Sequence, residues 1–184
     1  MDILDKAIIY AVKSHSGSFR KGTSTPYITH PIEAVSIVAT MTNDQRVLAA
    51  TALHDVVEDT EVAIDDIRRD FGDTVARLVA AESENKRDSL PPKTTWKIRK
   101  QETLDHLKNA TKEEKMIALG DKLSNMRAIY RDYYTVGDKL WERFNQKDKT
   151  EHAWYYKAIA ELLSDLGDAF AYNEYVELVN KIFN

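Results

Sequence analysis

The sequence contains no cysteine, which excludes disulfide bonds and thiolate metal sites. Glycine and proline are scarce, with six and four residues among 184, and strand-like alternation of polar and apolar residues is hard to find. No apolar run reaches the roughly 20 residues that a membrane-spanning helix needs, and the N-terminus does not have the pattern of a secretory signal. The net charge of −4 gives no general attraction for nucleic acid, so an anionic ligand needs a local basic cluster. These absences predict a cytoplasmic protein without a membrane or nucleic-acid partner.

Apolar residues recur instead with helical periodicity along most of the chain. The pattern predicts an all-α fold, a single-domain helical bundle over residues 1–184. Thr111 and Glu114 have the spacing of a capping box and predict the start of the longest helix. Segment 84–93 is the least regular, because Pro91-Pro92 must interrupt any helix. The expected helices cover residues 2–15, 31–42, 43–59, 64–70, 72–83, 94–109, 111–134, 138–145, 150–166 and 172–183.

The stretch LHDVVEDT, residues 53–60, places four ionisable side chains at the end of an otherwise apolar helix. At 3.6 residues per turn, His54 lies over Glu58 and Asp55 over Asp59, so all four gather on one side. A helix that is apolar on nearly all sides is normally buried, and buried charge is costly unless it is paired or bound to metal. For an isolated His-Asp pair, a solvated face or a satisfied core histidine would be the simpler interpretation.

Two other segments shift the interpretation toward a metal site. His30 stands before Pro31 at the start of an apolar helix, where its imidazole can point inward. Asp121 lies within another apolar helix beside Gly120, which costs roughly 1 kcal/mol relative to alanine and therefore suggests a close backbone approach. Two imidazole nitrogens and two carboxylate oxygens suit a first-row divalent ion such as manganese, iron, zinc or cobalt. The predicted metal ligands are His30, His54, Asp55 and Asp121.

The order His30, then His54-Asp55, then Asp121 resembles that of the metal ligands in the HD phosphohydrolase superfamily. The segments FRKGTSTPYITHP, LHDVVEDT, DIRRDFGDTVARLV and ALGDKLSNMR further resemble the hydrolase domain of the RelA/SpoT alarmone enzymes and the small alarmone hydrolases. The resemblance spans about residues 1–131 and is weaker over the helices at 138–184. It implies an HD-type bundle with manganese as the ion. It also implies hydrolysis of a guanosine 3′,5′-bispyrophosphate at the 3′-pyrophosphate, releasing pyrophosphate and GDP or GTP.

The same resemblance implies roles for residues around the predicted ligands. Glu58 and Asp59 would serve in acid–base catalysis beside a metal-activated water. Arg20 and Asn125 would contact the nucleotide and its phosphates, a task for which the bidentate geometry of arginine is suited. Three lysines are further candidates for phosphate contacts: Lys21, Lys86 and Lys122.

Segment 83–93 departs from the Asp-Asp-Lys-Ser-Leu-Pro loop of the resembled hydrolases, which leaves the base and phosphate preference open. The chain could therefore hydrolyse another nucleotide, such as a nucleoside monophosphate or a phosphorylated dinucleotide. It could also be a nucleotide-binding sensor without turnover, although retention of every ligand type argues against that. A purely structural helical module would leave the buried charges without a purpose. The oligomeric state cannot be read from these patterns.

Aromatic and histidine residues outside the predicted metal site have simpler interpretations. Tyr155, Ile159, Leu162 and Leu166 recur at helical spacing, which favours the core over stacking on a purine. The same applies to the neighbouring aromatic residues Trp141, Phe144, Trp154 and Tyr156. No partner is evident in the sequence for the remaining histidines, which are expected to be structural or exposed: His15, His106 and His152.

Overall fold

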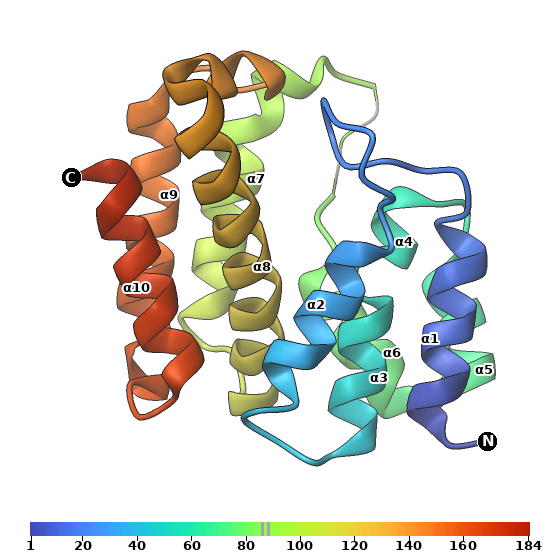
Figure 1. Ribbon diagram of the computed structural model, residues 1–184. Helices are drawn as coiled ribbons and strands as arrows, with labels where there is room; N and C mark the ends of the chain where they lie inside the picture. Colours follow the sequence, from blue (N-terminus) through green and yellow to red (C-terminus); the bar gives the residue numbers. More distant parts are fainter. Residues whose placement is uncertain (86, 88) are drawn as a thin grey trace. The chain divides into compact units, whose positions relative to one another are not determined.

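The computed structural model describes residues 1–85, 87 and 89–184. Within these ranges the chain is predominantly helical, which confirms the prediction of an all-α fold (Figure 1). Strand-like pairing in the same ranges is confined to an isolated antiparallel bridge between Phe19 and Pro26. No helix in the described part of the chain has both the length and the apolar character that spanning a membrane would require.

The helices follow the predicted order, with most boundaries shifted by a few residues. The segment after the longest helix forms a 3-10 helix rather than an α-helix. α7 begins at Pro92, because proline is tolerated at the first position of a helix. The elements are α1 Ile3–Ser14, α2 Thr29–Val38, α3 Gln45–Leu53, α4 Val56–Asp59, α5 Ile64–Phe71, α6 Asp73–Glu82, α7 Pro92–Leu107, α8 Lys112–Val136, η1 Gly137–Arg143, α9 Lys149–Leu162, η2 Ser164–Leu166 and α10 Phe170–Phe183.

The chain divides into two compact units, and the expectation of a single domain stays a prediction. The first unit comprises Met1–Ser83 and Thr111–Asp121, and the second comprises Glu84–Ala110 and Lys122–Asn184. Helix α8 therefore contributes its first part to one unit and its remainder to the other. Both units have buried apolar side chains of their own.

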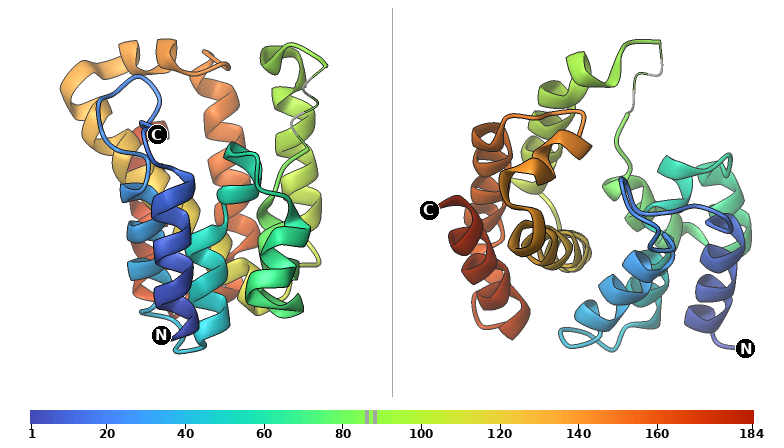
Figure 2. Two further views of the ribbon diagram at one scale, coloured as in Figure 1. Left: turned by 90° about the vertical axis from the view of Figure 1, so that its right-hand side faces the viewer. Right: turned by 45° about the horizontal axis from the view of Figure 1, so that its top comes forward.

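In the first unit, α3 is the central helix and packs against α1, α2 and α6. Every residue of α3 from Val47 to Leu53 is buried, because the helix is apolar around its whole circumference. Figure 2 shows α1 lying beside α3. The end of this central helix delivers the His54-Asp55 pair into the interior of the unit.

The start of α8 has the reciprocal capping box that the sequence predicted. The backbone N–H of Thr111 donates to Oε2 of Glu114 at 3.0 Å, and the backbone N–H of Glu114 donates to Oγ1 of Thr111 at 3.3 Å. The Glu114 carboxylate also forms an ion pair with Arg77 of α6. These contacts fix the beginning of α8 within the first unit.

Farther along α8, Gly120 allows the close backbone approach expected from the sequence. A Cβ atom on Gly120 would lie 2.5 Å from Cγ2 of Val38 and 3.1 Å from the carbonyl oxygen of Ala34, both on α2. Such distances leave no room for a larger residue without movement of α2. Glycine at this position thus brings Asp121 close to the start of α2, where His30 lies.

In the second unit, α9 packs against both α7 and α10. Tyr175 of α10 is fully buried, and its hydroxyl donates to the carbonyl oxygen of Tyr156 at 2.9 Å. Tyr155, Ile159 and Leu166 are buried as predicted, while Leu162 is only half-buried. The second unit therefore has an aromatic-rich core built largely around α9.

Candidate functional site

The His54-Asp55 pair interrupts a helix that the sequence predicted to be continuous over residues 43–59. Helix α3 ends at Leu53, α4 begins at Val56, and the two residues between them form a turn. Neighbouring side chains of a regular helix point about 100° apart and diverge from each other. In the turn, Nε2 of His54 lies 3.2 Å from Oδ2 of Asp55. The prediction of one unbroken helix is wrong, and the interruption aims both side chains at the same point.

Four side chains of the first unit converge at this point, and they are the four predicted metal ligands. The Nε2 atoms of His30 and His54 lie 3.2 Å apart. Oδ1 of Asp121 is 3.2 Å from Nε2 of His30 and 3.8 Å from Nε2 of His54. Oδ2 of Asp55 is 3.4 Å from Nε2 of His30. Residues from the start of α2, the α3–α4 turn and the middle of α8 are thereby brought together.

The spacing of these donor atoms fits a single divalent ion. Bonds from such an ion to imidazole nitrogen and carboxylate oxygen are about 2.0–2.2 Å long, so neighbouring donors lie roughly 3.0–3.5 Å apart. The buried residues His30, His54 and Asp121 each offer one donor within 4.8 Å of the others. Two nitrogens and two carboxylate oxygens form a set that suits manganese, iron or zinc.

Hydrogen bonding by the second ring nitrogen of His54 supports the same arrangement. Nδ1 of His54 lies 2.8 Å from the carbonyl oxygen of Thr51, which can only accept a hydrogen bond. Nδ1 therefore carries the proton, and Nε2 faces the other donors. Histidine ligands in metal sites usually have their second nitrogen held in this way.

The electrostatics of the cluster favour positive charge at its centre. Burial disfavours the His54 imidazolium, but the Asp55 and Asp121 carboxylates outweigh burial and raise the pKa of His54 to about 10. Burial also opposes ionisation of Asp55, yet the charge on His54 and hydrogen bonds from both histidines hold the pKa of Asp55 well below its usual value. A divalent cation would take the place of the proton on His54, since a metal ligand must be deprotonated.

Tyr27 is part of the site, and the sequence reasoning missed it. Its hydroxyl donates to Oδ2 of Asp55 at 2.7 Å. Burial, followed by the negative charge of Asp55, raises the pKa of Tyr27, so the hydroxyl keeps its proton and remains a donor. Its ring stacks on the ring of His15, with centroids 4.7 Å apart. The available signal was the spacing in PYITHP, where Tyr27 precedes His30 by three residues.

The other candidate residues of the first unit lie on segments that adjoin the cluster. Glu58 is half-buried and Asp59 is exposed, and both belong to the short helix α4 directly after the His54-Asp55 turn. The guanidinium of Arg20 lies over the ring of Tyr27, 5.4 Å from its centroid. Lys21 is exposed in the same loop. The candidate Lys86 lies outside the described residues.

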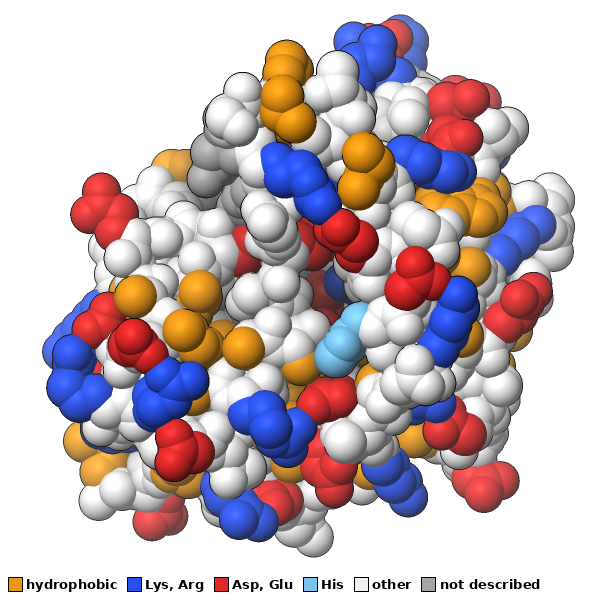
Figure 3. All heavy atoms as spheres, turned by 180° about the vertical axis from the view of Figure 1, so that it is seen from behind, with side chains coloured by type: hydrophobic (Ala, Val, Ile, Leu, Met, Phe, Trp, Pro, Cys, Tyr) orange, Lys and Arg blue, Asp and Glu red, His pale blue; other side chains and the backbone are white. Residues whose placement is uncertain are grey.

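The remaining two candidates, Lys122 and Asn125, line a cavity of about 180 Å³ in the second unit. Sequence reasoning did not select Lys100, which also lines the cavity, and it assigned the aromatic residues around it to the core. Figure 3 shows acidic and basic side chains interspersed over the face that it draws. The other lining residues are Trp96, Phe144, His152, Tyr155 and Tyr156.

Two of the aromatic residues that line the cavity, His152 and Tyr155, also carry polar groups. His152 is buried, and its Nε2 lies 2.8 Å from the carbonyl oxygen of Gln146, which accounts for its expected structural role. His15 is likewise buried, whereas His106 is exposed. The hydroxyl of Tyr155 is buried without a hydrogen-bond partner. A buried hydroxyl without a protein partner is a typical place for an ordered water.

Comparisons with known proteins agree with this geometry. The family model described as "HD domain" matches residues 7–150. The guanosine-3′,5′-bis(diphosphate) 3′-pyrophosphohydrolase MESH1 of Danio rerio is 33% identical over 132 residues, which are 70% of each chain. A GTP pyrophosphokinase of Streptomyces coelicolor is 46% identical over 76 residues, which are 41% of this chain. The chain spans only 9% of that relative's length and 17% of a similar Brucella ovis protein.

Similarity to a solved structure extends over nearly the whole chain. A metazoan ortholog of SpoT, described as hydrolysing ppGpp and acting in starvation responses, superposes with a TM-score of 0.78 at 25% identity. The match covers 98% of this chain and 96% of the other. The family model and the relative that is 33% identical together show that this chain belongs to the HD domain family.

Proposed function

We propose that the protein is a metal-dependent nucleotide phosphohydrolase that acts on guanosine 3′,5′-bispyrophosphates. The observation that carries the proposal is the convergence of His30, His54 and Asp121, whose donor atoms lie within 4.8 Å of one another. Oδ2 of Asp55 lies 3.4 Å from Nε2 of His30 and 3.2 Å from Nε2 of His54. The activity named for the Danio rerio relative supports the choice of substrate. The reaction is hydrolysis of the 3′-pyrophosphate ester, with release of pyrophosphate and GDP or GTP.

In this mechanism the four ligands would hold the ion, and neighbouring residues would move protons. A bound divalent ion lowers the pKa of a coordinated water and withdraws charge from a phosphoryl oxygen. Glu58 accepts the proton of the attacking water as its oxygen bonds to phosphorus. As the ester P–O bond breaks, the leaving ribose 3′ oxygen takes up a proton that Asp59 relays from solvent. The position of both residues in α4, directly after the His54-Asp55 turn, supports these proposed roles.

Binding of the nucleotide falls to the cationic and amide side chains. Arg20 is held by the ring of Tyr27 beside Asp55 and can present two parallel N–H groups to a phosphate. Lys122 and Asn125 offer positive charge and hydrogen bonds at the second-unit cavity. Lys21 and Lys86 remain further proposals for phosphate contacts. We propose manganese as the ion, and a cytoplasmic location stays a prediction from the sequence.

The test is release of pyrophosphate from guanosine tetraphosphate in the presence of manganese, with zinc, iron, cobalt and magnesium assayed in parallel. The Asp55→Ala variant, in which one ligand is removed, is the matched negative control. The expected result is release of one pyrophosphate per nucleotide by the parent and none by the variant. Absence of release with every metal would contradict the alarmone substrate while leaving the fold assignment unchanged.

A second candidate is hydrolysis of another nucleotide, favoured by the unusual segment 83–93. Glu84 in this segment places a carboxylate against Lys100 at the wall of the cavity. A panel of nucleoside monophosphates and phosphorylated dinucleotides, assayed separately for phosphate and pyrophosphate, distinguishes the two. Tight nucleotide binding without turnover in any assay would instead indicate a sensor.

A further inference from the structure

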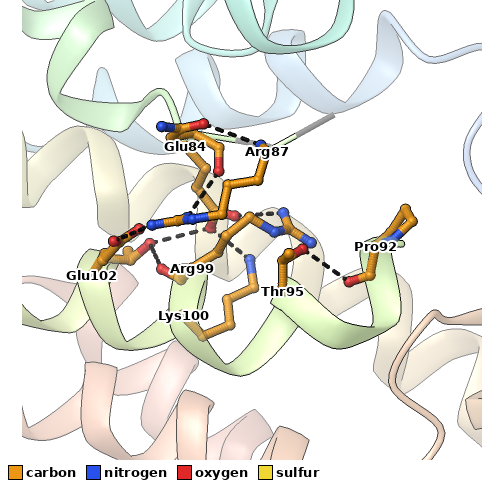
Figure 4. A network of polar contacts seen from close by, with 9 residues as sticks. Glu84, Arg87, Pro92, Thr95, Arg99, Lys100 and Glu102 are labelled. Atoms are coloured by element: carbon orange, nitrogen blue, oxygen red, sulfur yellow. Dashed lines mark hydrogen bonds and ion pairs between the residues drawn. The ribbon is translucent and has the colours of Figure 1, made fainter. Parts of the chain in front are cut away.

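The carboxylate of Glu84, in the second unit, is paired with the ammonium group of Lys100, a lysine that lines the cavity. Figure 4 shows Glu84 reaching across to Arg99 and Lys100 of α7. Arg99 donates from Nη1 to Oε2 of Glu84 at 2.8 Å. Lys100 donates from Nζ to Oε1 at 2.7 Å, and the hydroxyl of Thr103 donates to the same oxygen at 3.1 Å. Both oxygens of Glu84 therefore have charged partners.

This network is shielded from water. The side chains of Glu84, Arg99 and Lys100 are 10%, 11% and 19% exposed, respectively. Burial alone would favour the neutral acid, but the charges of Lys100, Lys122 and Arg99 outweigh it and lower the pKa of Glu84. Glu84 is accordingly a carboxylate, and its hydrogen bonds with the cations are stronger than they would be at the surface.

The same Lys100 lines the cavity, together with Lys122 and Asn125. Its ammonium lies 4.9 Å from the centroid of the Tyr155 ring. Tyr155 contributes a buried hydroxyl that has no hydrogen-bond partner. Two ammonium groups and an amide around one cavity match a ligand with several anionic oxygens, such as a phosphate or pyrophosphate group.

We propose that Glu84 is a built-in counter-anion that competes with anionic ligands for Lys100. A phosphate-bearing group entering the cavity must displace the carboxylate from the ammonium before it can form its own contact. Glu84 thereby sets the affinity of the cavity for anions. The choice of a phosphate-bearing ligand rests on the proposed function. The binding test below involves no turnover, so its failure is distinguishable from failure of the hydrolysis assay.

Glu102, on α7 with Lys100, provides a matched control for Glu84. Glu102 accepts from Nη1 of Arg87 at 3.0 Å and also pairs with Nη2 of that arginine. Its side chain is 52% exposed, and its described ion pair is with Arg87. Replacing either glutamate with glutamine changes the net charge by the same amount. Of the two glutamates, Glu84 is the one that contacts Lys100. A general electrostatic effect would appear in both variants.

The experiment is calorimetric titration of inorganic pyrophosphate into the full chain after removal of metal by chelation and desalting. Four proteins are compared: the parent, Glu84→Gln, Glu102→Gln and the double variant Glu84→Gln/Lys100→Met. We expect Glu84→Gln to bind pyrophosphate about tenfold more tightly, because a charge-assisted hydrogen bond no longer has to be broken. Glu102→Gln should stay within about twofold of the parent. The double variant should lose the gain.

A folded Glu84→Gln protein with unchanged or weaker pyrophosphate affinity would overturn the proposal and make Glu84 a structural anchor only. An equal gain in Glu102→Gln would also overturn it. If thermal unfolding shows that Glu84→Gln does not fold, Glu84→Asp takes its place. This variant keeps the charge but shortens the side chain by one methylene, so it should loosen the pair and give a smaller gain. No gain in Glu84→Asp would then reject the proposal.

Discussion

The two polar clusters of this chain balance their charges in opposite ways. In the first unit, the carboxylates of Asp55 and Asp121 face two imidazoles, and they outweigh burial and raise the pKa of His54. In the second unit, the Lys100 ammonium is met by Glu84 at 2.7 Å. Buried charge must be compensated in both places. We expect the first cluster to take up a cation from solution, whereas the second carries its own counter-ion.

This difference teaches how each cluster should respond to change. A site that binds a cation from solution depends on every donor, since each donor lost weakens the attraction for the ion. A site that is already neutralised binds its ligand in competition with an internal group, so removal of that group strengthens binding. Substitutions that remove negative charge should therefore weaken ion binding in the first unit and strengthen anion binding in the second.

The largest effect is expected from loss of a ligand in the first cluster. Asp121→Asn keeps the size of the side chain but removes the charge that faces both histidines. Because changes outside the ligands themselves cost about 10–100-fold in metal affinity, loss of a ligand should cost more than about 100-fold. Manganese affinity, measured by titration calorimetry, and pyrophosphate release should fall together.

Asp73→Asn is the control for that experiment, because Asp73 is an acid of the same unit with a 91% exposed side chain. It should bind manganese like the parent. If Asp121→Asn also binds manganese like the parent, the first cluster is not the manganese site, and the contrast between the two units fails.

For Glu58→Gln we expect a loss of activity nearly as large as that of Asp121→Asn, but with manganese binding retained. The amide cannot accept a proton from water, and general base catalysis is commonly worth about 10²–10⁴ in rate. The turnover number for pyrophosphate release should fall by that factor while manganese affinity stays near that of the parent. Glu61→Gln, which removes an exposed charge just beyond α4, should retain full activity. A Glu58→Gln enzyme with normal turnover would remove Glu58 from the mechanism.

The sequence was sufficient to select the four residues that converge in the first unit, but not the geometry that joins them. His30, His54, Asp55 and Asp121 stand out because polar residues interrupt apolar helical patterns, and such interruptions are visible in the sequence. The turn between α3 and α4 is not visible in this way. Local periodicity favours one continuous helix, whereas the turn is accompanied by tertiary contacts such as the bond from Tyr27 to Asp55.

The second cluster was the harder one to predict, and for a related reason. Glu84 and Lys100 are sixteen residues apart in the chain, and nothing in their spacing distinguishes them from ordinary surface charges. Their pairing depends on the path of segment 83–93, which has no periodic pattern. The capping box at Thr111 and Glu114, by contrast, was predictable because both partners lie within one turn of the same helix.

A smaller effect on the metal centre is expected for Tyr27→Phe. The substitution removes the hydroxyl that donates to Asp55 at 2.7 Å and leaves the ring in contact with His15. Loss of a hydrogen bond that orients a ligand should lower manganese affinity by about 10–100-fold. Tyr10→Phe is the control, since Tyr10 of α1 packs edge-to-face against Phe71. Equal affinities in parent and Tyr27→Phe would show that Asp55 needs no support from Tyr27.

The smallest expected effect concerns the backbone that supports Asp121, and its sign is informative. Alanine is a better helix former than glycine by about 1 kcal/mol, so helix propensity alone predicts that Gly120→Ala stabilises the protein. The contacts at Gly120 predict the opposite, because its Cβ would lie 2.5 Å from Val38 Cγ2. Overpacking of this kind costs about 1–3 kcal/mol. Unfolding in urea should therefore show a lower free energy of unfolding for Gly120→Ala.

Val38→Ala tests the cause of that loss. Removal of Cγ2 creates a small cavity in the parent but makes room for the new methyl group in Gly120→Ala. The double variant should then be more stable than the sum of the two single effects predicts, which is the signature of residues in contact. If the two single effects on the free energy of unfolding simply add, the loss in Gly120→Ala does not come from contact with Val38. A stabilising Gly120→Ala would mean that α2 can move away from α8 freely, and the spacing between His30 and Asp121 would then not depend on this glycine.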